Sequence, residues 1–281
     1  MNGRRAVVGL CMLCALLVSA FAAQSASAIT GTTAVTCAKT GAKQVGSETF
    51  NTEHCVPKEG AGEYEHYEIA EKTTTELSGN DGGNPEDNTK LKATLGGVAT
   101  TLTSTELSGE GSMENLVDED GEHYAHGTGT ITYTGVTISP FTKCFVYTHD
   151  GSGTVGAQGV VDTTPLTATT TKQGHGLKFE PVNKVTKVFA KFWILDKNKV
   201  GAGGECAIHG TYTVTGSVIA TPDGATAKTT HTKVTEQNTL KMGTGEPTIK
   251  AGIEGSLTIK GRDKKTEEVN YTPLSVTTVE T

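Results

Sequence analysis

The stretch GTGTITYTGVTI at residues 127–138 alternates between two kinds of side chain. Ile131 and Tyr133 fall on one face of an extended chain, and the threonines between them fall on the other. Threonine favours strands because its branched Cβ suits the pleated backbone, and glycine marks turns and bulges between strands. Similar stretches recur along the chain, and good helix formers are scarce after the first residues. The sequence therefore predicts an all-β protein, mainly antiparallel, with ten or more strands in a sandwich or a barrel.

Residues 1–28 contain the three parts of a secretory signal peptide in their usual order. Arg4 and Arg5 give a positive start, residues 6–23 form an apolar run, and small residues follow with an A-x-A sequence that ends at Ala28. The apolar run is short for a membrane span, and the cleavage-like sequence follows it directly. We therefore expect cleavage near Ala28, no membrane span afterwards, and a protein that is secreted or held at the cell surface.

The expected mature chain has two parts. Residues 29–66 form a cysteine-containing N-terminal head segment, and residues 67–281 form the β domain. Within the β domain, residues 177–179 and 185–195 are predicted to pair as a hairpin. The second of these segments concentrates aromatic and aliphatic side chains, so we expect the single tryptophan, Trp193, to be buried in the core.

Several short sequences occur twice. A GTxTxTG sequence precedes a TPL[TS]xTT sequence near residues 127–171 and again near residues 209–279, which predicts two related units and an internal duplication. Convergence is the alternative, because strands rich in Thr and Gly resemble one another easily. Leu166 and Leu274 are expected to point inward, each after a proline at the start or rim of its strand. The pentapeptide TELSG also recurs, but at another spacing, so the chain is no regular solenoid.

Four cysteines remain after the expected cleavage, and an even number in an exported protein favours disulfides. Four cysteines allow three pairings, of which the most local joins Cys37 to Cys55 and leaves Cys144 for Cys206. The Cys37–Cys55 loop would contribute roughly 3 kcal/mol in the chain-entropy model. A zinc site built on Cys206-x-x-His209 and His54-Cys55 is the alternative, but neither spacing recurs in a four-ligand pattern.

The formal net charge of −7 and the lack of a basic stripe argue against nucleic-acid binding. Two acidic loops, residues 80–88 and 118–122, carry the oxygen ligands that Ca²⁺ prefers, but neither has the spacing of an EF-hand. We therefore predict no cofactor, with calcium at these loops as the open alternative. The sequence does not identify a partner; a cell-surface or extracellular polymer is the class to consider.

Two groups of residues could carry chemistry. His149, Asp150 and Ser152 are the residue types of a nucleophilic triad, but neighbours in a tight turn rarely reach triad geometry. His123 and His126 could ligate a metal, but positions i and i+3 of a regular strand face opposite sides. We therefore predict no catalytic, cofactor-binding or metal-ligating residue, and the four cysteines are the only site residues predicted.

The chain also resembles a known group of proteins in several stretches. The runs HGTGTITYTGV, GLKFEPV, GTYTVTGSVIATPDGAT, QNTLK, AGIEGSLTIKGRD and YTPLSVTT resemble a group of uncharacterised exported β-rich proteins of actinobacteria. The resemblance covers most of the chain from about residue 67. It implies export and a β-rich fold, and it implies no activity and no site.

Two functions of different classes follow as hypotheses. The first is an exported non-catalytic protein, either a surface or matrix component or a module that binds an unknown ligand. The second is an extracytoplasmic hydrolase acting on carbohydrate or a similar substrate. A cleft lined by convergent His, Asp or Glu residues would favour the hydrolase, and a convex surface of Thr and Gly would favour the first hypothesis. We favour the first, because no catalytic group of residues stands out.

Overall fold

The computed structural model describes residues 31–39, 49–50, 64–68, 72–79, 88–171, 176–223, 226–229, 238–262 and 271–279. All regular elements of these residues are strands, and the pairings are antiparallel except for a short parallel contact between β1 and β8. The predicted all-β, mainly antiparallel fold with more than ten strands is therefore confirmed. The strands are β1 (Gly31–Lys39), β2 (Thr49–Phe50), β3 (Tyr64–Glu68), β4 (Thr73–Gly79), β5 (Thr89–Leu95), β6 (Val98–Ser104), β7 (Glu106–Val117), β8 (His123–Thr134), β9 (Thr137–Ser139), β10 (Phe145–His149), β11 (Val155–Gln158), β12 (Val161–Asp162), β13 (Leu166–Thr170), β14 (Leu177–Pro181), β15 (Val188–Leu195), β16 (Gly210–Thr215), β17 (Val218–Asp223), β18 (Thr226–Thr229), β19 (Lys241–Gly243), β20 (Ile249–Arg262) and β21 (Tyr271–Val279).

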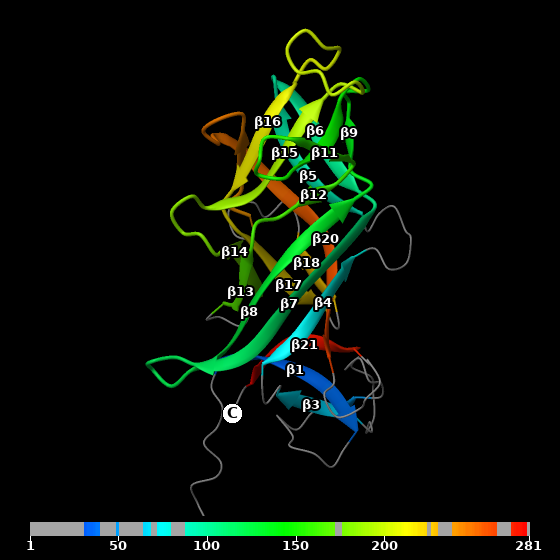
Figure 1. The fold of residues 1–281 in the computed structure, drawn as a ribbon. Helices are drawn as coiled ribbons and strands as arrows, with labels where there is room; N and C mark the ends of the chain where they lie inside the picture. The colour runs from blue at the N-terminus through cyan, green and yellow to red at the C-terminus, as the bar shows by residue number, and fades with distance from the viewer. Residues whose placement is uncertain are drawn as a thin grey trace, which may run out of the picture.

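The lower half of the molecule, as seen in Figure 1, is a closed barrel. The C-terminal part of β20 pairs with β4 on one side and with β18 on the other. Between these two partners the pairing runs continuously through β7, β8, β13, β14 and β17. The ring of hydrogen-bonded strands therefore closes on β20, which leaves no free sheet edge around this half.

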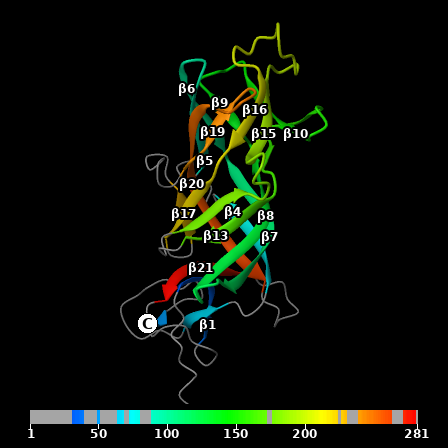
Figure 2. The same ribbon diagram turned by 90° about the vertical axis from the view of Figure 1, so that its left-hand side faces the viewer.

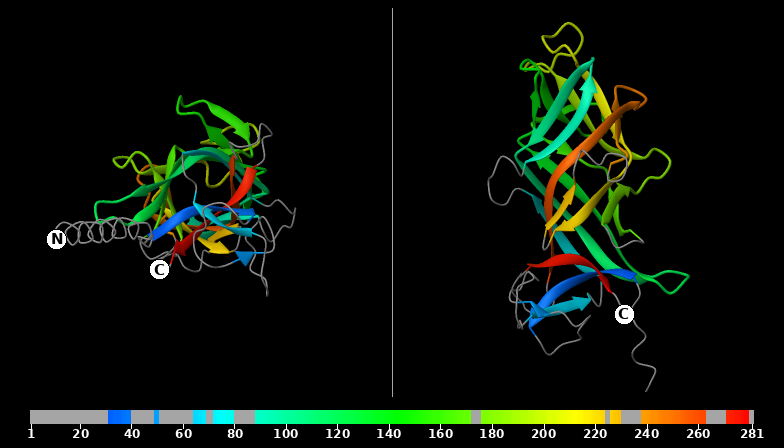
Figure 3. Two further views of the ribbon diagram at one scale, coloured as in Figure 1. Left: turned by 90° about the horizontal axis from the view of Figure 1, so that it is seen from below. Right: turned by 180° about the vertical axis from the view of Figure 1, so that it is seen from behind.

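The upper half consists of two sheets that diverge from β20. Its N-terminal part pairs with β5, which leads to β6 and β9, and with β19, which leads to β16, β15, β10 and β11. Figure 2 and the right-hand view of Figure 3 show these sheets on opposite sides of the upper half. The sequence left open whether the fold is a sandwich or a barrel, and the structure combines a closed barrel with two facing sheets.

The lower end of the barrel is crossed by the first and last strands. β1 pairs with β21 and β3, and these strands lie beneath the barrel in Figure 1. Asn115 of β7 holds β1 by its backbone: its Oδ1 accepts the N–H of Ala34, and its Nδ2 donates to the carbonyl of Ala34, both at 2.9 Å. The head segment thus shares a sheet with the β domain, and the expected boundary after residue 66 falls within β3.

The two copies of TELSG lie side by side in β4 and β7. The register places Leu77 opposite Gly109 and Gly79 opposite Leu107. A Cβ added at Gly79 would lie 3.1 Å from the Cβ of Leu107, and one added at Gly109 would lie 3.4 Å from the Cβ of Leu77. Each glycine therefore makes room for the buried leucine of the other copy, and the repeated pentapeptide forms a self-complementary strand pair.

The first TPL copy is built into the barrel wall. Leu166 and Ala168 are buried as expected, and Pro165 directly precedes β13. Thr163 and Thr170 are buried too, contrary to an outward position, because their hydroxyls accept hydrogen bonds from backbone N–H groups of β8. The two hydroxyls therefore provide hydrogen-bond acceptors for backbone N–H groups of β8 at both ends of β13.

The second TPL copy has different strand neighbours. β21 pairs with β1 and β20, whereas β13 pairs with β8 and β14. The direction of Leu274 lies outside the described side chains. The strand pairing therefore does not put the two TPL copies in equivalent positions of the sheet. The duplication of residues 127–171 and 209–279 stays a prediction.

The predicted hairpin between residues 177–179 and 185–195 is wrong. β14 pairs with β13 and β17 in the barrel, whereas β15 pairs with β10 and β16 in the upper half. The connection turns around Asn183, whose Oδ1 accepts the N–H groups of Val185 and Thr186. The same turn residues serve a hairpin and a crossing between sheets, so the local sequence does not separate the two.

Candidate ligand-binding cavities in the interior

The residues of the triad hypothesis form a turn. The N–H of Gly151 donates to Nδ1 of His149 at 3.0 Å, and the hydroxyl of Ser152 donates to Oδ1 of Asp150 at 2.7 Å. The Ser152 hydroxyl lowers the pKa of the Asp150 carboxyl because the bond stabilises its charged form. Ser152 thus bonds the carboxylate, while the histidine nitrogen accepts from the backbone. This arrangement is that of a β-turn and not of a nucleophile activated by a base.

The expectation that Trp193 lies in the core is wrong. Phe192 and Ile194 are buried on the inner face of β15, and Trp193 lies half-buried on the opposite face. Its ring stacks on that of His149, with centroids 5.4 Å apart and planes at 14°. Its Nε1 is buried and has no hydrogen-bond partner among the described residues. The sequence of β15 gave no sign of which face points outward, because apolar side chains that are at least partly buried occur on both faces of the strand.

The candidate metal ligands are not brought together. His126 lies opposite Glu114 in the β7–β8 ladder, whereas His123 lies opposite Val117 at the end of that ladder. In the described part of the chain, no group of three or more His, Cys, Asp or Glu residues could hold a metal ion.

The acidic loop at 118–122 is organised by its own hydrogen bonds. Oδ1 of Asp118 accepts the N–H groups of Asp120 and Glu122. This carboxylate therefore holds the turn at the tip of β7 and β8. Most of the other acidic loop, residues 80–87, lies outside the described residues.

The predicted disulfide between Cys144 and Cys206 is confirmed. Its sulfur atoms are bonded to each other, so the alternative zinc site at Cys206 and His209 is wrong; Nδ1 of His209 instead lies 2.9 Å from the carbonyl oxygen of Cys206. The other predicted pair, Cys37 with Cys55, lies outside the described residues.

The disulfide ties the connection between β15 and β16, residues 196–209, to Cys144 just before β10. The hydroxyl of Tyr147 donates to the carbonyl of Asp196 at 3.0 Å, and Nζ of Lys199 lies 5.5 Å from the centre of the tyrosine ring. Tyr147 is therefore buried although it lies on the same face as the half-buried Trp193, its register partner in β15.

Three adjoining cavities run through the interior of the molecule. The lower cavity, about 30 Å³, lies inside the closed barrel, and the upper cavity, about 40 Å³, lies between the two sheets. The middle cavity, about 30 Å³, shares Ile131 and Phe179 with the lower one. It shares Thr89, Tyr133, Phe189 and Ile253 with the upper one. Neighbouring cavities therefore have part of their walls in common.

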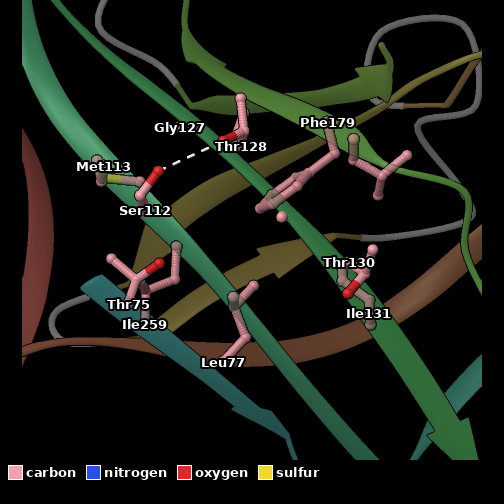
Figure 4. Close-up of a pocket in the computed structure, with 13 residues that line it drawn as sticks. Thr75, Leu77, Ser112, Met113, Gly127, Thr128, Thr130, Ile131, Phe179 and Ile259 are labelled. Atoms are coloured by element: carbon pink, nitrogen blue, oxygen red, sulfur yellow. Dashed lines mark hydrogen bonds between the residues drawn. The ribbon is translucent and has the colours of Figure 1, made fainter. Parts of the chain in front are cut away.

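Figure 4 shows the lower cavity with residues contributed by β4, β7, β8, β14 and β20. Gly127 and Gly129 line it without side chains, so the backbone of β8 forms part of its wall. The hydroxyls of Ser112 and Thr128, whose oxygens lie 3.3 Å apart, pair in an exposed position on the outer side of this wall and add no polar group to the cavity. The remaining lining is mainly apolar, which makes the cavity suitable for an apolar molecule.

The described residues that line the three cavities include no Asp, Glu, Lys, Arg, His or Cys. Their polar groups are hydroxyls and backbone groups. An interior of this kind stabilises apolar groups and penalises an unpaired charge. It can therefore hold a small apolar molecule, and its lining provides no carboxylate, imidazole or thiol for acid–base or nucleophilic catalysis.

The sequence analysis missed these cavities. One signal was available, because small residues occupy inward positions of the long strands: Thr75 in β4, Thr89 in β5, and Gly127 and Gly129 in β8. Small inward residues leave space only if the facing strands do not fill it. The facing strands come from distant parts of the sequence, so the signal was not sufficient.

Comparison of the chain with protein-family models, with curated proteins and with solved structures found no match. Among the described residues, no helix has the length and apolar character that crossing a membrane requires.

Proposed function

We propose that this chain is an exported, non-catalytic protein that binds a small apolar molecule in its interior. The observation that carries the proposal is the series of three adjoining cavities with mainly apolar linings. Burial of an apolar molecule there is favourable by about 25 cal/mol for each Å² removed from water. The cavities, of about 30–40 Å³ each, are little larger than the roughly 30 Å³ that one water molecule takes in the liquid, so the ligand must be very small.

Export is supported by two independent features. The sequence begins with the three parts of a signal peptide, and Cys144 and Cys206 form a disulfide, which persists mainly in oxidising compartments. These two features support the proposal that the mature protein acts outside the cytoplasm, either free or at the cell surface.

A route for the ligand is provided by the incompletely covered wall. Leu91 lines the upper cavity and Leu257 lines the middle cavity, and both side chains keep partial exposure although they pack against the core. On this proposal a small molecule would enter by displacing one of these side chains, Leu91 in the upper half or Leu257 in the barrel wall.

The second candidate, an extracytoplasmic hydrolase, has less support. Its best group of residues, His149, Asp150 and Ser152, lies in a turn in which Ser152 bonds the carboxylate. The convex outer face of the barrel instead alternates hydroxyl and acidic side chains, as Ser108, Glu110 and Ser112 do along β7. Such a face agrees with a non-catalytic surface or binding role.

Binding of xenon, a compact apolar probe, to the purified mature protein, followed by NMR, tests the proposal. Ala190 is buried and lines the upper cavity, so Ala190→Leu fills space that the ligand needs. We expect xenon to bind the wild-type protein and its affinity to fall at least about tenfold in the filled variant, because overlap excludes the ligand. Ala157→Leu on exposed β11 is the matched control. Failure of xenon to bind the folded wild-type protein contradicts the proposed function.

A further inference from the structure

Three exposed lysines gather on the outside of the upper half. They are Lys191 of β15, Lys241 of β19 and Lys250 of β20. Lys241 lies directly opposite Lys250 on one side and Thr215 on the other, and Lys191 lies opposite Thr213. Residues paired across a ladder share a face of the sheet, and so do residues two apart in one strand. The lysines therefore share one face of the sheet formed by β19, β16, β15, β10 and β11, and the buried residues beside them in the chain show that it is the outer face.

The charge of this face is unbalanced. The five described strands of the sheet contain no Asp or Glu, although the whole chain has a formal net charge of −7. Among the described residues, no carboxylate forms an ion pair with any of the three lysines, and this includes Glu246 in the turn between β19 and β20. Like charges directly opposite each other destabilise a ladder, as Lys241 and Lys250 do in the free protein. A bound anion would relieve this repulsion, so the face is complementary to an acidic partner.

An aromatic surface lies on the same face. Trp193 follows Lys191 by two residues, and its ring stacks on that of His149. Nε1 is the only polar atom of the tryptophan side chain and is buried, so the exposed part of the indole is carbon. Sugar rings pack their C–H groups against such aromatic surfaces, and sugar hydroxyls form hydrogen bonds with hydroxyl side chains. Threonines occupy the outer positions of β16 beside these residues: Thr211, Thr213 and Thr215.

We infer that this face is a docking site for an acidic polysaccharide, whose anionic groups contact the lysines while its sugar rings contact Trp193. From Trp193 to Lys241 the face extends on the order of 15–20 Å, from the usual spacing of strands and of residues along them. This length accommodates several sugar units of one extended chain. An acidic peptide would also neutralise the lysines, but the carbon surface of Trp193 and the row of threonines favour a sugar chain. The site lies on the outside of the molecule and does not depend on a ligand in the interior cavities.

Oligogalacturonate, a chain of sugars that each carry a carboxylate, is the probe, and isothermal titration calorimetry on the mature protein measures its affinity. We expect it to bind, a neutral dextran oligomer of similar length not to bind, and polyglutamate to bind more weakly. Raising the salt concentration from about 50 mM to about 500 mM should weaken binding, because salt screens exposed charges. The double variant Lys241→Gln, Lys250→Gln should weaken it by about 2- to 20-fold, because each exposed ion pair contributes little.

The single tryptophan of the chain gives a second readout that needs no substitution. Bound oligogalacturonate should shield Trp193 from quenching by acrylamide, whereas polyglutamate should not. This difference separates a surface that contacts sugar rings from one that attracts any polyanion.

The matched control is the double variant Lys72→Gln, Lys92→Gln, which removes the same number of charges from lysines that already lie beside Glu114 and Glu254. We expect it to keep the wild-type affinity. Equal losses in the two double variants would overturn the docking site, since net charge alone would then explain binding. No binding of oligogalacturonate, or equal binding of polyglutamate without shielding of Trp193, would overturn it as well. The xenon experiment reports on the interior, so the failure of either proposal is distinguishable from the failure of the other.

Discussion

At the scale of single residues, glycine decides how closely the strands of the barrel approach. A Cβ added at Gly109 would lie 2.5 Å from the carbonyl oxygen of Thr130, a backbone atom that cannot rotate away. We expect Gly109→Ala to lower the free energy of unfolding by about 1–3 kcal/mol, as other overpacked sites do, in urea titrations followed by circular dichroism. Gly201→Ala is the control, since its nearest atoms would lie 3.7 Å away. Equal losses at both positions would refute the explanation.

Asn115 uses both ends of its amide to hold Ala34, and a second prediction follows from this. Asn115→Asp removes the donor to the Ala34 carbonyl while keeping the size of the side chain. We expect the free energy of local opening of β1 to fall by about 1–3 kcal/mol. This loss would be measured as faster amide hydrogen exchange in β1. In contrast, Asn183→Asp should have little effect, because Asn183 accepts two backbone N–H groups through Oδ1 and a carboxylate keeps that role. Unchanged exchange in the Asn115 variant would contradict the prediction.

The single tryptophan allows a third prediction. His149 covers one face of Trp193, so His149→Ala should expose the indole and increase the quenching of its fluorescence by acrylamide. His126→Ala, on β8 of the barrel, should leave the quenching unchanged. A His149 variant with wild-type quenching would show that other groups shield the tryptophan.

At the scale of elements, the Cys144–Cys206 disulfide keeps the loop at residues 196–209 over Tyr147. The bonded cysteines are 62 residues apart, and a loop of this length contributes about 4 kcal/mol in the chain-entropy model. Burial, followed by the charge of Asp196, raises the pKa of the Tyr147 hydroxyl.

The double variant Cys144→Ser, Cys206→Ser should therefore lower the free energy of unfolding and move the pKa of Tyr147 back toward about 10. Ultraviolet titration, with the same variant carrying Tyr147→Phe as reference, isolates this tyrosine. A raised pKa that survives removal of the disulfide would mean that the loop stays in place without it.

At the scale of the whole molecule, three tyrosines make stability depend on alkaline pH. Burial raises the pKa of Tyr133, Tyr147 and Tyr212. The unfolded chain ionises these groups at about pH 10, while the folded chain keeps them neutral to higher pH. Their stabilising contribution is therefore complete below about pH 10 and is lost as the pH rises through the folded pKa values.

We expect the free energy of unfolding to fall above about pH 10, by up to about 1.4 kcal/mol per pH unit for each such tyrosine. Urea unfolding at several alkaline pH values measures this slope. Tyr133→Phe should make the slope shallower, whereas Tyr124→Phe should not. A slope that is identical in the wild-type protein and Tyr133→Phe would show that Tyr133 ionises equally in both states.

The sequence by itself determined the properties that depend on near neighbours in the chain. The alternation around Ile131 and Tyr133 predicted strands, because side chains of an extended chain point to opposite sides in turn. It also placed Leu166 and Ala168 on an inner face. The Cys144–Cys206 disulfide followed from the number of cysteines and from choosing the most local partner for the other two.

Only the tertiary structure decided which strands are neighbours and which face each side chain meets. It joined β14 to β17 instead of β15, set Trp193 on the outer face, and brought Thr89 and Tyr133 to the same two cavities. The physical reason is that these outcomes depend on contacts between residues far apart in the chain. A strand's alternation specifies that it has two faces, but the partner strands determine its neighbours, its covered face and the space left between side chains.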